Sequence, residues 1–260
     1  MCREETEEAI VDFVLVSTED GIVTMTLNRG KVNALNESVI QELRDTFTLL
    51  KSDEAVKAII LTGNGSFFSF GFDIPEFLNV SRDDFERFLI NFTNLYSYVF
   101  LFPKPVIAAI NGHTIAGGCM IALACDYRLM VSGKAKISLN EITFGASVFA
   151  GCVEMLKGCV GQRKAQEILY SGALYTAEEA FGFGLIDRVT SLEKLTLEAE
   201  RVAHEFAGKH PDAFGSIKRL LRDRSYKMMK EQEMDSIREF VEIWYSDETW
   251  ANLQDIKIHP

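Results

Sequence analysis

Apolar and polar residues alternate in two neighbouring segments near the start of the chain. Residues 11–17 and 22–28 both show a period of two, which is typical of strands with one buried face. The turn residues Glu19, Asp20 and Gly21 separate the two segments. The pattern therefore predicts a β-hairpin.

The spacing of apolar residues changes to that of a helix after Asn36, a residue type that caps helices. One face of this helix is expected to be buried, at Val39, Ile40, Leu43, Phe47 and Leu50. Residues 58–62 then form a short apolar run that predicts a strand. The first unit of the chain is therefore expected to run strand, strand, helix, strand.

The middle of the chain continues to alternate between the two types of element. A loop rich in Gly and Phe at 63–73 precedes a long predicted helix at 82–102 and a buried strand at 106–110. A short helix from Ala116 and a strand at 126–131 follow. This alternation predicts an α/β fold.

The second half is mainly helical in its spacing, apart from a short predicted strand at 186–189. Thr176 and Glu179 have the spacing of a capping box. No linker of Pro, Gly or Ser separates the two halves. We therefore predict one α/β core over residues 1–190, followed by a helical region over residues 191–260.

The final helices carry more apolar residues than one buried face requires. The excess is found at Phe240, Val241, Trp244 and Trp250. We predict that these side chains pack on another subunit.

Composition narrows the class of protein. The chain has 260 residues, 47% of them apolar, with a mean hydropathy of +0.04, which is enough for a large core and excludes disorder as the main state. A net charge of −11 argues against nucleic acid as a partner, because phosphates attract basic surfaces. No run approaches the ~20 apolar residues that span a bilayer, so no membrane partner is expected.

The cysteines and the N-terminus indicate a compartment. Five cysteines are an odd number, and none form a CxxC pair, so we expect reduced thiols that behave as small buried apolar side chains. The first ten residues are acidic and have no apolar core of a secretory leader. A cytoplasmic location is expected.

Two segments with glycines are the best candidates for chemistry, because the motifs of serine hydrolases, phosphate loops and zinc helices are absent. Residues 69–77 contain Gly71, and residues 111–120 contain Gly117 and Gly118 at the start of a predicted helix. The first amides of a helix have no acceptor within it. If amides from both loops converge they form an oxyanion hole; otherwise the loops are ordinary turns and caps.

Three separated segments resemble one known family. They read KVNALN, FFSFGFDIPEF and KPVIAAINGHTIAGGCMIALACDYRLM, and begin at Lys31, Phe67 and Lys104. In order and spacing they are similar to the enoyl-CoA hydratase/isomerase family, the crotonase superfamily. The resemblance implies a crotonase-like spiral of strand-strand-helix (ββα) units with a helical C-terminal region that forms trimers or dimers of trimers.

The resemblance also implies a binding site for an acyl-CoA thioester. Its carbonyl oxygen would lie between the backbone amides of Phe72 and Gly117. Ala34 would offer its carbonyl to the adenine of CoA, and Lys31 or Arg29 would meet a phosphate, supplying locally the positive charge that the chain lacks overall.

Further residues of the two glycine loops are assigned to the same site by resemblance: Gly71, Asp73, Ile74 and Gly118. For Asp73 we expect a helix cap or loop anchor rather than a catalytic carboxylate.

The catalytic carboxylates depart from the pattern of hydratases, which the family resemblance implies use two glutamates around a water molecule. Met120 stands at the place of the first, and Glu141 at the place of the second. A thioether cannot deprotonate water. The run containing Leu139, Asn140 and Glu141 is more similar to Δ3,Δ2-enoyl-CoA isomerases, and apolar neighbours are expected to raise the pKa of Glu141.

The sequence therefore predicts an enoyl-CoA isomerase that shifts a 3-enoyl-CoA to the 2-trans isomer through a dienolate, without a metal or redox cofactor. Two alternatives stay open. One is a hydratase or thioester hydrolase with another carboxylate, for which Glu154 is the nearest candidate. The other is an acyl-CoA-binding homologue without catalysis.

Overall fold

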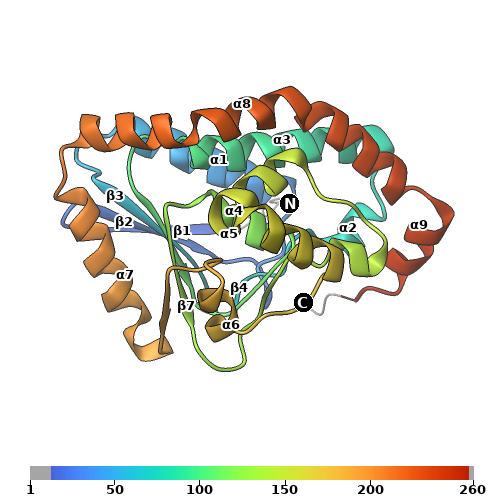
Figure 1. The fold of residues 1–260 in the computed structure, drawn as a ribbon, viewed down its shortest axis with the longest axis horizontal. Helices are drawn as coiled ribbons and strands as arrows, with labels where there is room; N and C mark the ends of the chain where they lie inside the picture. The colour runs from blue at the N-terminus through green and yellow to red at the C-terminus, as the bar shows by residue number, and fades with distance from the viewer. Residues whose placement is uncertain (1–12, 258–260) are drawn as a thin grey trace, which may run out of the picture.

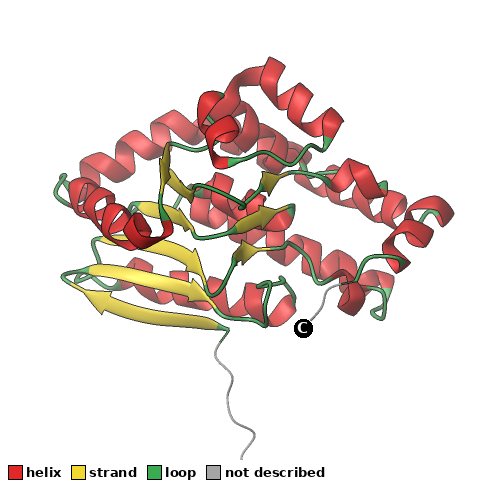
Figure 2. Ribbon diagram, turned by 90° about the horizontal axis from the view of Figure 1, so that it is seen from below, coloured by secondary structure: helices red, strands yellow, loops and turns green. Residues whose placement is uncertain are grey.

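The computed structural model describes residues 13–257, and its strands form two sheets (Figure 2). The strands are β1 (Val14–Glu19), β2 (Ile22–Leu27), β3 (Ala58–Gly63), β4 (Phe67–Ser69), β5 (Val106–Ile110), β6 (His113–Ile115), β7 (Tyr127–Val131), β8 (Ile137–Ser138) and β9 (Arg188–Thr190). The larger sheet has the order β1-β2-β3-β5-β7-β9, and only its β1–β2 hairpin is antiparallel. The smaller sheet is parallel, in the order β4-β6-β8.

The helices surround these sheets (Figure 1). They are α1 (Glu37–Ser52), α2 (Ile74–Phe77), α3 (Arg82–Phe100), α4 (Gly117–Ala124), the 3₁₀ helix η1 (Glu141–Phe144), α5 (Ala150–Ser171), α6 (Ala177–Gly182), α7 (Leu192–Ala207), α8 (Pro211–Trp244) and α9 (Asp247–Gln254). None of the described helices is long and apolar enough to cross a membrane.

The chain winds as a spiral in which each turn gives one strand to each sheet. The pairs β3 and β4, β5 and β6, and β7 and β8 divide in this way, and helices follow each pair. The predicted spiral of strand-strand-helix units is therefore confirmed. Because the strands of these three pairs run parallel within each sheet, the ends of successive turns are brought to the same region of the molecule.

Local signals in the sequence set the helix boundaries. The side chain of Asn36 accepts a hydrogen bond from the amide of Val39 at 3.1 Å, and so caps α1 as predicted. Thr176 and Glu179 form both bonds of the capping box at the start of α6. The hairpin is confirmed as well, although residues 11 and 12 of its predicted first strand lie outside the described residues.

The short strands of the smaller sheet were not predicted. Residues 63–73 were expected to be a loop, yet β4 lies within them, and β6 directly follows Asn111 and Gly112. Strands of two or three residues are too short to show a period of two, so only their partners in the spiral define them.

The C-terminal helices pack on the rest of this chain. The side chains of Phe240, Val241 and Trp244 are buried, and the Trp244 ring lies 4.6 Å from that of Phe85 in α3. For these three residues the prediction that they pack on another subunit was wrong. The second half of α8 runs beside α3 and α5, which supply the other side of the apolar contact, while Trp250 stacks on Tyr245.

A charged cluster holds α8 to the strands. Asp126, just before β7, forms ion pairs with Lys218 at 2.7 Å and Arg222 at 3.0 Å, and accepts a hydrogen bond from the backbone amide of Val106 at 2.8 Å. Burial lowers the pKa of Lys218 to about 8, while the charge of Asp126 opposes this shift. The carboxylate thus joins the helical region to the α/β core.

Candidate active site

An apolar chamber of about 270 Å³ lies where the ends of the spiral turns meet the C-terminal helices. Its walls come from the two glycine loops, η1, the start of α5, the end of α8 and the C-terminal segment: Phe70, Phe72, Ile74, Ile115, Ala116, Gly117, Met120, Asn140, Glu141, Thr143, Phe144, Phe149, Phe240, Trp244 and Ile256. Glu141 is the only carboxylate among these residues. The chamber can hold an apolar chain next to one acid or base.

The two glycine loops converge at the edge of this chamber. Gly71 has a φ of +93°, and a Cβ added to it would lie 2.9 Å from the carbonyl oxygen of Ile115 and 3.1 Å from the amide nitrogen of Gly117. Both the dihedral angle and the close approach require glycine. A Cβ on Gly117 would likewise meet the Phe72 ring at 3.0 Å. The loops are therefore in direct contact.

The backbone amides of Phe72 and Gly117 are free at this point. A short bridge links Leu35 to the neighbours of Phe72, through Leu35 N to Gly71 O at 2.8 Å and Asp73 N to Leu35 O at 2.9 Å. Neither the Phe72 nor the Gly117 amide donates to another described residue. Two free donors on touching loops are the arrangement that an oxyanion hole requires.

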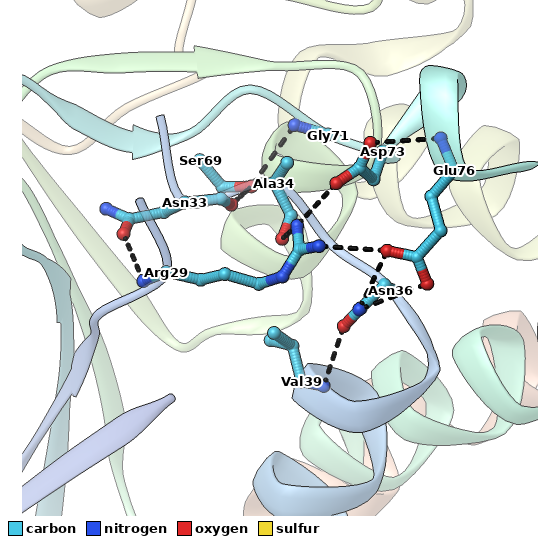
Figure 3. Close-up of polar contacts among 9 residues, drawn as sticks. All are labelled: Arg29, Asn33, Ala34, Asn36, Val39, Ser69, Gly71, Asp73 and Glu76. Carbon is cyan, nitrogen blue, oxygen red and sulfur yellow. Dashed lines mark hydrogen bonds and ion pairs between the residues drawn. The ribbon is translucent and has the colours of Figure 1, made fainter. Parts of the chain in front are cut away.

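Strain and buried polar contacts hold the two amides in place. Ala116, just before α4, has a φ of +49°, a sparsely populated conformation that sets the direction of the Gly117 amide. Ser69 accepts a bond from the amide of Gly71 at 3.1 Å and donates to the carbonyl of Asn33 at 2.8 Å (Figure 3). A Cβ on Gly118 would lie 2.6 Å from the Ser69 carbonyl oxygen, so α4 packs closely on β4.

Arg29 connects the glycine loop of residues 69–77 to the segment that contains Ala34. Its guanidinium donates to Asp73 at 2.6 Å, to Glu76 at 2.9 Å and to the carbonyl of Ala34 at 3.1 Å (Figure 3). Asp73 also caps α2 by accepting from the Glu76 amide at 3.2 Å. The expected anchoring role of Asp73 is therefore confirmed, and the guanidinium expected near a phosphate is already bound to two carboxylates. Ile74, the first residue of α2, lines the chamber.

A second cavity, of about 490 Å³, lies beside the KVNALN segment. Lys31 and Lys257 line it, and neither ammonium forms an ion pair with a described residue. Phe70 lines both this cavity and the apolar chamber, so the two spaces adjoin. Lys257 was not predicted, because no local pattern distinguishes it from the other lysines of the chain.

Glu141 opens η1, which ends at Gly145 with a left-handed φ of +89°. The residue is 4% exposed, and neither oxygen of its carboxyl group has a hydrogen-bond partner among the described residues. Burial raises the pKa of Glu141 to about 8, as its apolar surroundings led us to expect. A carboxyl group that titrates near neutral pH can both accept and return a proton.

The last helix fixes the position of η1. The hydroxyl of Thr249 donates to the carbonyl of Gly145 at 2.9 Å, and the amide of Asn252 donates to the carbonyl of Phe144 at 3.3 Å. A Cβ on Gly145 would lie 2.8 Å from the Thr249 hydroxyl, so α9 sits directly on this turn. Glu141 and the helix that supports its turn therefore come from segments far apart in the sequence.

Met120 lies in the chamber wall, whereas Glu154, the alternative carboxylate, does not. Met120 is buried and lines the chamber, at the position where hydratases were expected to carry their first glutamate. Glu154 is not in the chamber wall and pairs with Lys157 at 2.5 Å within α5, with a side chain that is half-buried. The chamber thus offers one carboxylate and a thioether.

An aromatic wall leads from Phe72 into the chamber. The ring centroids are 6.4 Å apart for Phe72 and Phe149, 4.7 Å for Phe149 and Phe240, and 5.7 Å for Phe240 and Trp244. Phe240 and Trp244 were predicted to form a subunit contact, so this wall was not predicted. Their helical spacing is the same for either role, and only the path of α8 distinguishes them.

Within residues 13–257, no group of three or more His, Cys, Asp or Glu side chains is arranged to hold a metal ion. Cys119, Cys125 and Cys152 are buried free thiols, as predicted, and Cys159 is half-buried. Burial raises the pKa of Cys125 to about 12. These thiols are therefore packing residues rather than nucleophiles.

Comparison with known proteins agrees with this geometry. The family model described as enoyl-CoA hydratase/isomerase matches residues 17–250. Crotonyl-CoA hydratase of Syntrophomonas wolfei is 32% identical over 75% of this chain and 76% of its own, and 2,3-dehydroadipyl-CoA hydratase of Escherichia coli is 34% identical over 80% and 81%. The crystal structure of human mitochondrial Δ3,Δ2-enoyl-CoA isomerase superposes with a TM-score of 0.90 at 26% identity, covering 94% of this chain and 96% of that one.

Proposed function

The chain belongs to the enoyl-CoA hydratase/isomerase family, and from this premise we propose that it is an isomerase that converts a 3-enoyl-CoA to the 2-trans isomer. One observation carries the proposal: among residues 13–257, Glu141 is the only carboxylate in the wall of the apolar chamber. Moving a double bond needs one group that takes a proton and gives it back. Adding water needs that group and a further one to hold the water.

The first step begins with the thioester carbonyl between the amides of Phe72 and Gly117. The Glu141 carboxylate takes a proton from C2 of the substrate, and the electron pair of that bond moves into the thioester to form a dienolate. Negative charge then develops on the thioester oxygen. Each of the two amides stabilises this charge by about 3 kcal/mol.

The second step returns the proton to the other end of the dienolate. Protonated Glu141 donates to C4, the double bond settles between C2 and C3, and the carbonyl re-forms. No atom is gained or lost, and the carboxylate is regenerated. Burial raises the pKa of Glu141 to about 8. Because this value is near neutral pH, the protonated side chain can also donate its proton to C4 in the second step.

Binding of the CoA portion is proposed for the cavity beside Lys31. Lys31 and Lys257 line it and would meet the phosphates, and the Phe70 side chain would lie where the thioester arm passes into the apolar chamber. Two local cations offset the repulsion that a chain of net charge −11 exerts on an anionic ligand. By this proposal Arg29 shapes the site through the loop rather than through the phosphate.

A hydratase is the second candidate, and the names of the curated relatives favour it. Met120 in the chamber wall argues against it, because a thioether neither orients nor deprotonates water. Incubation of a 2-trans-enoyl-CoA in ¹⁸O-labelled water separates the two reactions. An isomerase incorporates no label into the acyl chain, whereas a hydratase yields a labelled 3-hydroxyacyl-CoA.

The decisive experiment uses a 3-enoyl-CoA with deuterium at C2 and the purified chain. We expect a conjugated 2-trans product that retains part of the deuterium at C4, since one carboxyl group carries it between the two carbons. Glu141→Gln should lower kcat about 10²–10⁴-fold. Glu154→Gln is the matched control and should retain full activity, because Glu154 is absent from the chamber wall. Absence of conversion, or full activity in Glu141→Gln, contradicts the proposal.

A further inference from the structure

A third cavity, of about 540 Å³, lies between α1, α3 and α8. Helix α3 runs beside both of the other helices (Figure 1). None of the described residues that line this cavity also lines the apolar chamber or the cavity beside Lys31. The third cavity is therefore separate from the spaces assigned to the reaction and to CoA.

Three cations line the third cavity: Arg44 and Lys51 of α1, and Lys230 of α8. None of them forms an ion pair with any residue in the range 13–257. No Asp or Glu is found among the described residues of the cavity wall. In a chain with 38 acidic and 27 basic side chains, this wall is a local region of positive charge.

Two residues of α3 bring the three cations together. The Arg44 guanidinium donates to the backbone carbonyl of Asn94 at 3.5 Å, and the Lys230 ammonium donates to the side-chain oxygen of Asn94 at 3.3 Å. One helical turn later, the ring of Tyr98 has the Arg44 guanidinium 3.9 Å and the Lys51 ammonium 5.5 Å from its centre. Residues four apart share one helix face, so all three charges lie beside the same turn of α3.

The contacts of these cations are with neutral groups only. An amide oxygen, a carbonyl and an aromatic ring attract a cation, but they do not cancel the repulsion between like charges. The adjoining cavity, of about 450 Å³, is different, because its wall shares Lys51 but also contains Glu54 and Asp212. The third cavity therefore leaves to a ligand the negative charge that its neighbour supplies itself.

The carboxylates nearest to this wall are held by uncharged side chains. Gln41 donates to Asp45 at 2.9 Å, and Asn91 donates to Glu37 at 2.7 Å. Gln41 and Asn91 line the cavity, whereas Asp45 and Glu37 do not. These two carboxylates thus leave the three cations unpaired.

We propose that the third cavity binds a small anion that contains a diphosphate group, held by Arg44, Lys51 and Lys230. The guanidinium can donate two parallel hydrogen bonds to phosphate oxygens, and the two ammonium groups act as point charges on the others. A diphosphate places several negative charges on one compact group, as three adjacent cations require. The inference is independent of the proposed isomerase function, because none of the three cations lines the apolar chamber.

Inorganic pyrophosphate is the probe for this site. It is titrated by calorimetry into the full chain at low salt, without divalent metal ions and with CoA present in excess. We expect one saturable site with a Kd of about 1 mM or tighter, and weaker binding as salt is added. Inorganic phosphate is too small to meet all three cations and should bind at least about tenfold more weakly. Absence of saturable binding, or equal affinity for the two anions, overturns the proposal.

Two variants on different helices place the probe. Arg44→Ala and Lys230→Ala should each weaken binding of pyrophosphate about tenfold, the effect of one lost hydrogen bond between charged groups. Lys134→Ala removes an exposed lysine that lines none of the three cavities, and it should change the affinity less than about twofold. Urea unfolding confirms that all three variants are folded. Unchanged affinity in Arg44→Ala and Lys230→Ala would place the anion elsewhere and overturn the proposal.

The isomerase assay separates this inference from the proposed function. Arg44→Ala and Lys230→Ala should isomerise a 3-enoyl-CoA as fast as the parent, because neither residue lies in the chamber wall. If pyrophosphate binds as expected and the parent isomerises no 3-enoyl-CoA, the proposed function fails and the anion site stands. If the parent is active but binds no pyrophosphate, only the anion site fails.

Discussion

Two carboxyl groups of this protein are largely buried, but one has charged partners and the other has no partner among the described residues. Asp126 has a side chain that is 9% exposed, and it contacts Lys218, Arg222 and a backbone amide. Glu141 is 4% exposed and has no partner among the described residues. The first carboxylate remains compensated as a charge, whereas the second is pushed toward its neutral form, with a pKa of about 8.

The difference shows how to distinguish a structural group from a reactive one in the same fold. A charge removed from water must be paired, and the pair then fixes the elements that carry it. A buried carboxyl group without a partner must be held in place by the rigid structure around it. For Glu141 the contact of α9 with η1 provides this support. The unpaired group retains its capacity to exchange a proton.

Removing the structural carboxylate should have the largest effect. Asp126→Ala leaves Lys218 and Arg222 buried without a counter-charge, so we expect the free energy of unfolding to fall by about 3–5 kcal/mol. Urea unfolding at pH 7 measures this loss. Asp223→Ala, which breaks the exposed pair with Lys227, is the control and should change the free energy by less than about 1 kcal/mol. Similar losses of free energy in both variants would show that the buried ion pairs of Asp126 contribute no more to stability than an exposed pair.

A substitution at Gly71 tests the role of the backbone amides in the site. Gly71→Ala places a methyl group 2.9 Å from the Ile115 carbonyl oxygen and displaces the loop that carries the Phe72 amide. We expect kcat to fall about 10²-fold, as for the loss of one oxyanion donor. Gly133→Ala is the matched control, because Gly133 also has a positive φ, of +100°, but its added Cβ meets nothing within 4 Å. If both variants lose kcat equally, backbone strain and not the position of the amide is responsible.

The raised pKa of Glu141 should appear in the stability of the protein. A glutamate in the unfolded chain ionises near 4.5, and Glu141 in the folded chain near 8, so between these values the folded state holds one more proton. The free energy of unfolding should therefore fall as pH rises through this window, by up to about 1.4 kcal/mol per pH unit from this group. Below 4.5 and above 8 its contribution is constant.

Glu141→Gln isolates that contribution. The variant should be no more stable than the parent at pH 4.5 and progressively more stable than the parent toward pH 8, since it lacks the ionising group. Urea unfolding of both proteins at several pH values measures the difference. A difference that does not change with pH would show that Glu141 titrates at its ordinary value and is not held as an unpaired acid.

The smallest effect is expected at the solvent-exposed cations. Lys31→Glu should weaken binding of CoA several-fold at low salt and less at high salt, because exposed charges are screened. Titration of CoA by calorimetry at two ionic strengths measures this. Lys134→Glu makes the same charge change at an exposed lysine outside both cavities and serves as the control. Equal affinity in the two variants would place the phosphates away from Lys31.

The elements with their own local signals were predicted well. The cap at Asn36, the box at Thr176 and Glu179 and the alternating hairpin residues act over a few positions, so the sequence displays them directly. The strands of the smaller sheet could not be found, because β8 has two residues and owes its pairing to β6 of the preceding turn.

In the site, too, residues with a local sequence signal were predicted and residues without one were not. Glu141 and the glycine loops were identified from their segments, and the structure brings Glu141, Phe72 and Gly117 into one chamber. Trp244 and Lys257 were missed, because their places depend on the course of α8 and of the segment that follows it. A residue that reaches a site through a distant part of the chain has no local signal.

The contact of α9 with η1 has a consequence for the order in which the protein is made. The strands, the glycine loops and Glu141 all precede α9 along the chain, so a ribosome releases them first. The hydrogen bonds from Thr249 and Asn252 to the turn after Glu141 can form only after residues 247–254 have been synthesised. We therefore expect the strands of the nascent chain to pair before the turn that carries Glu141 is held in its final position.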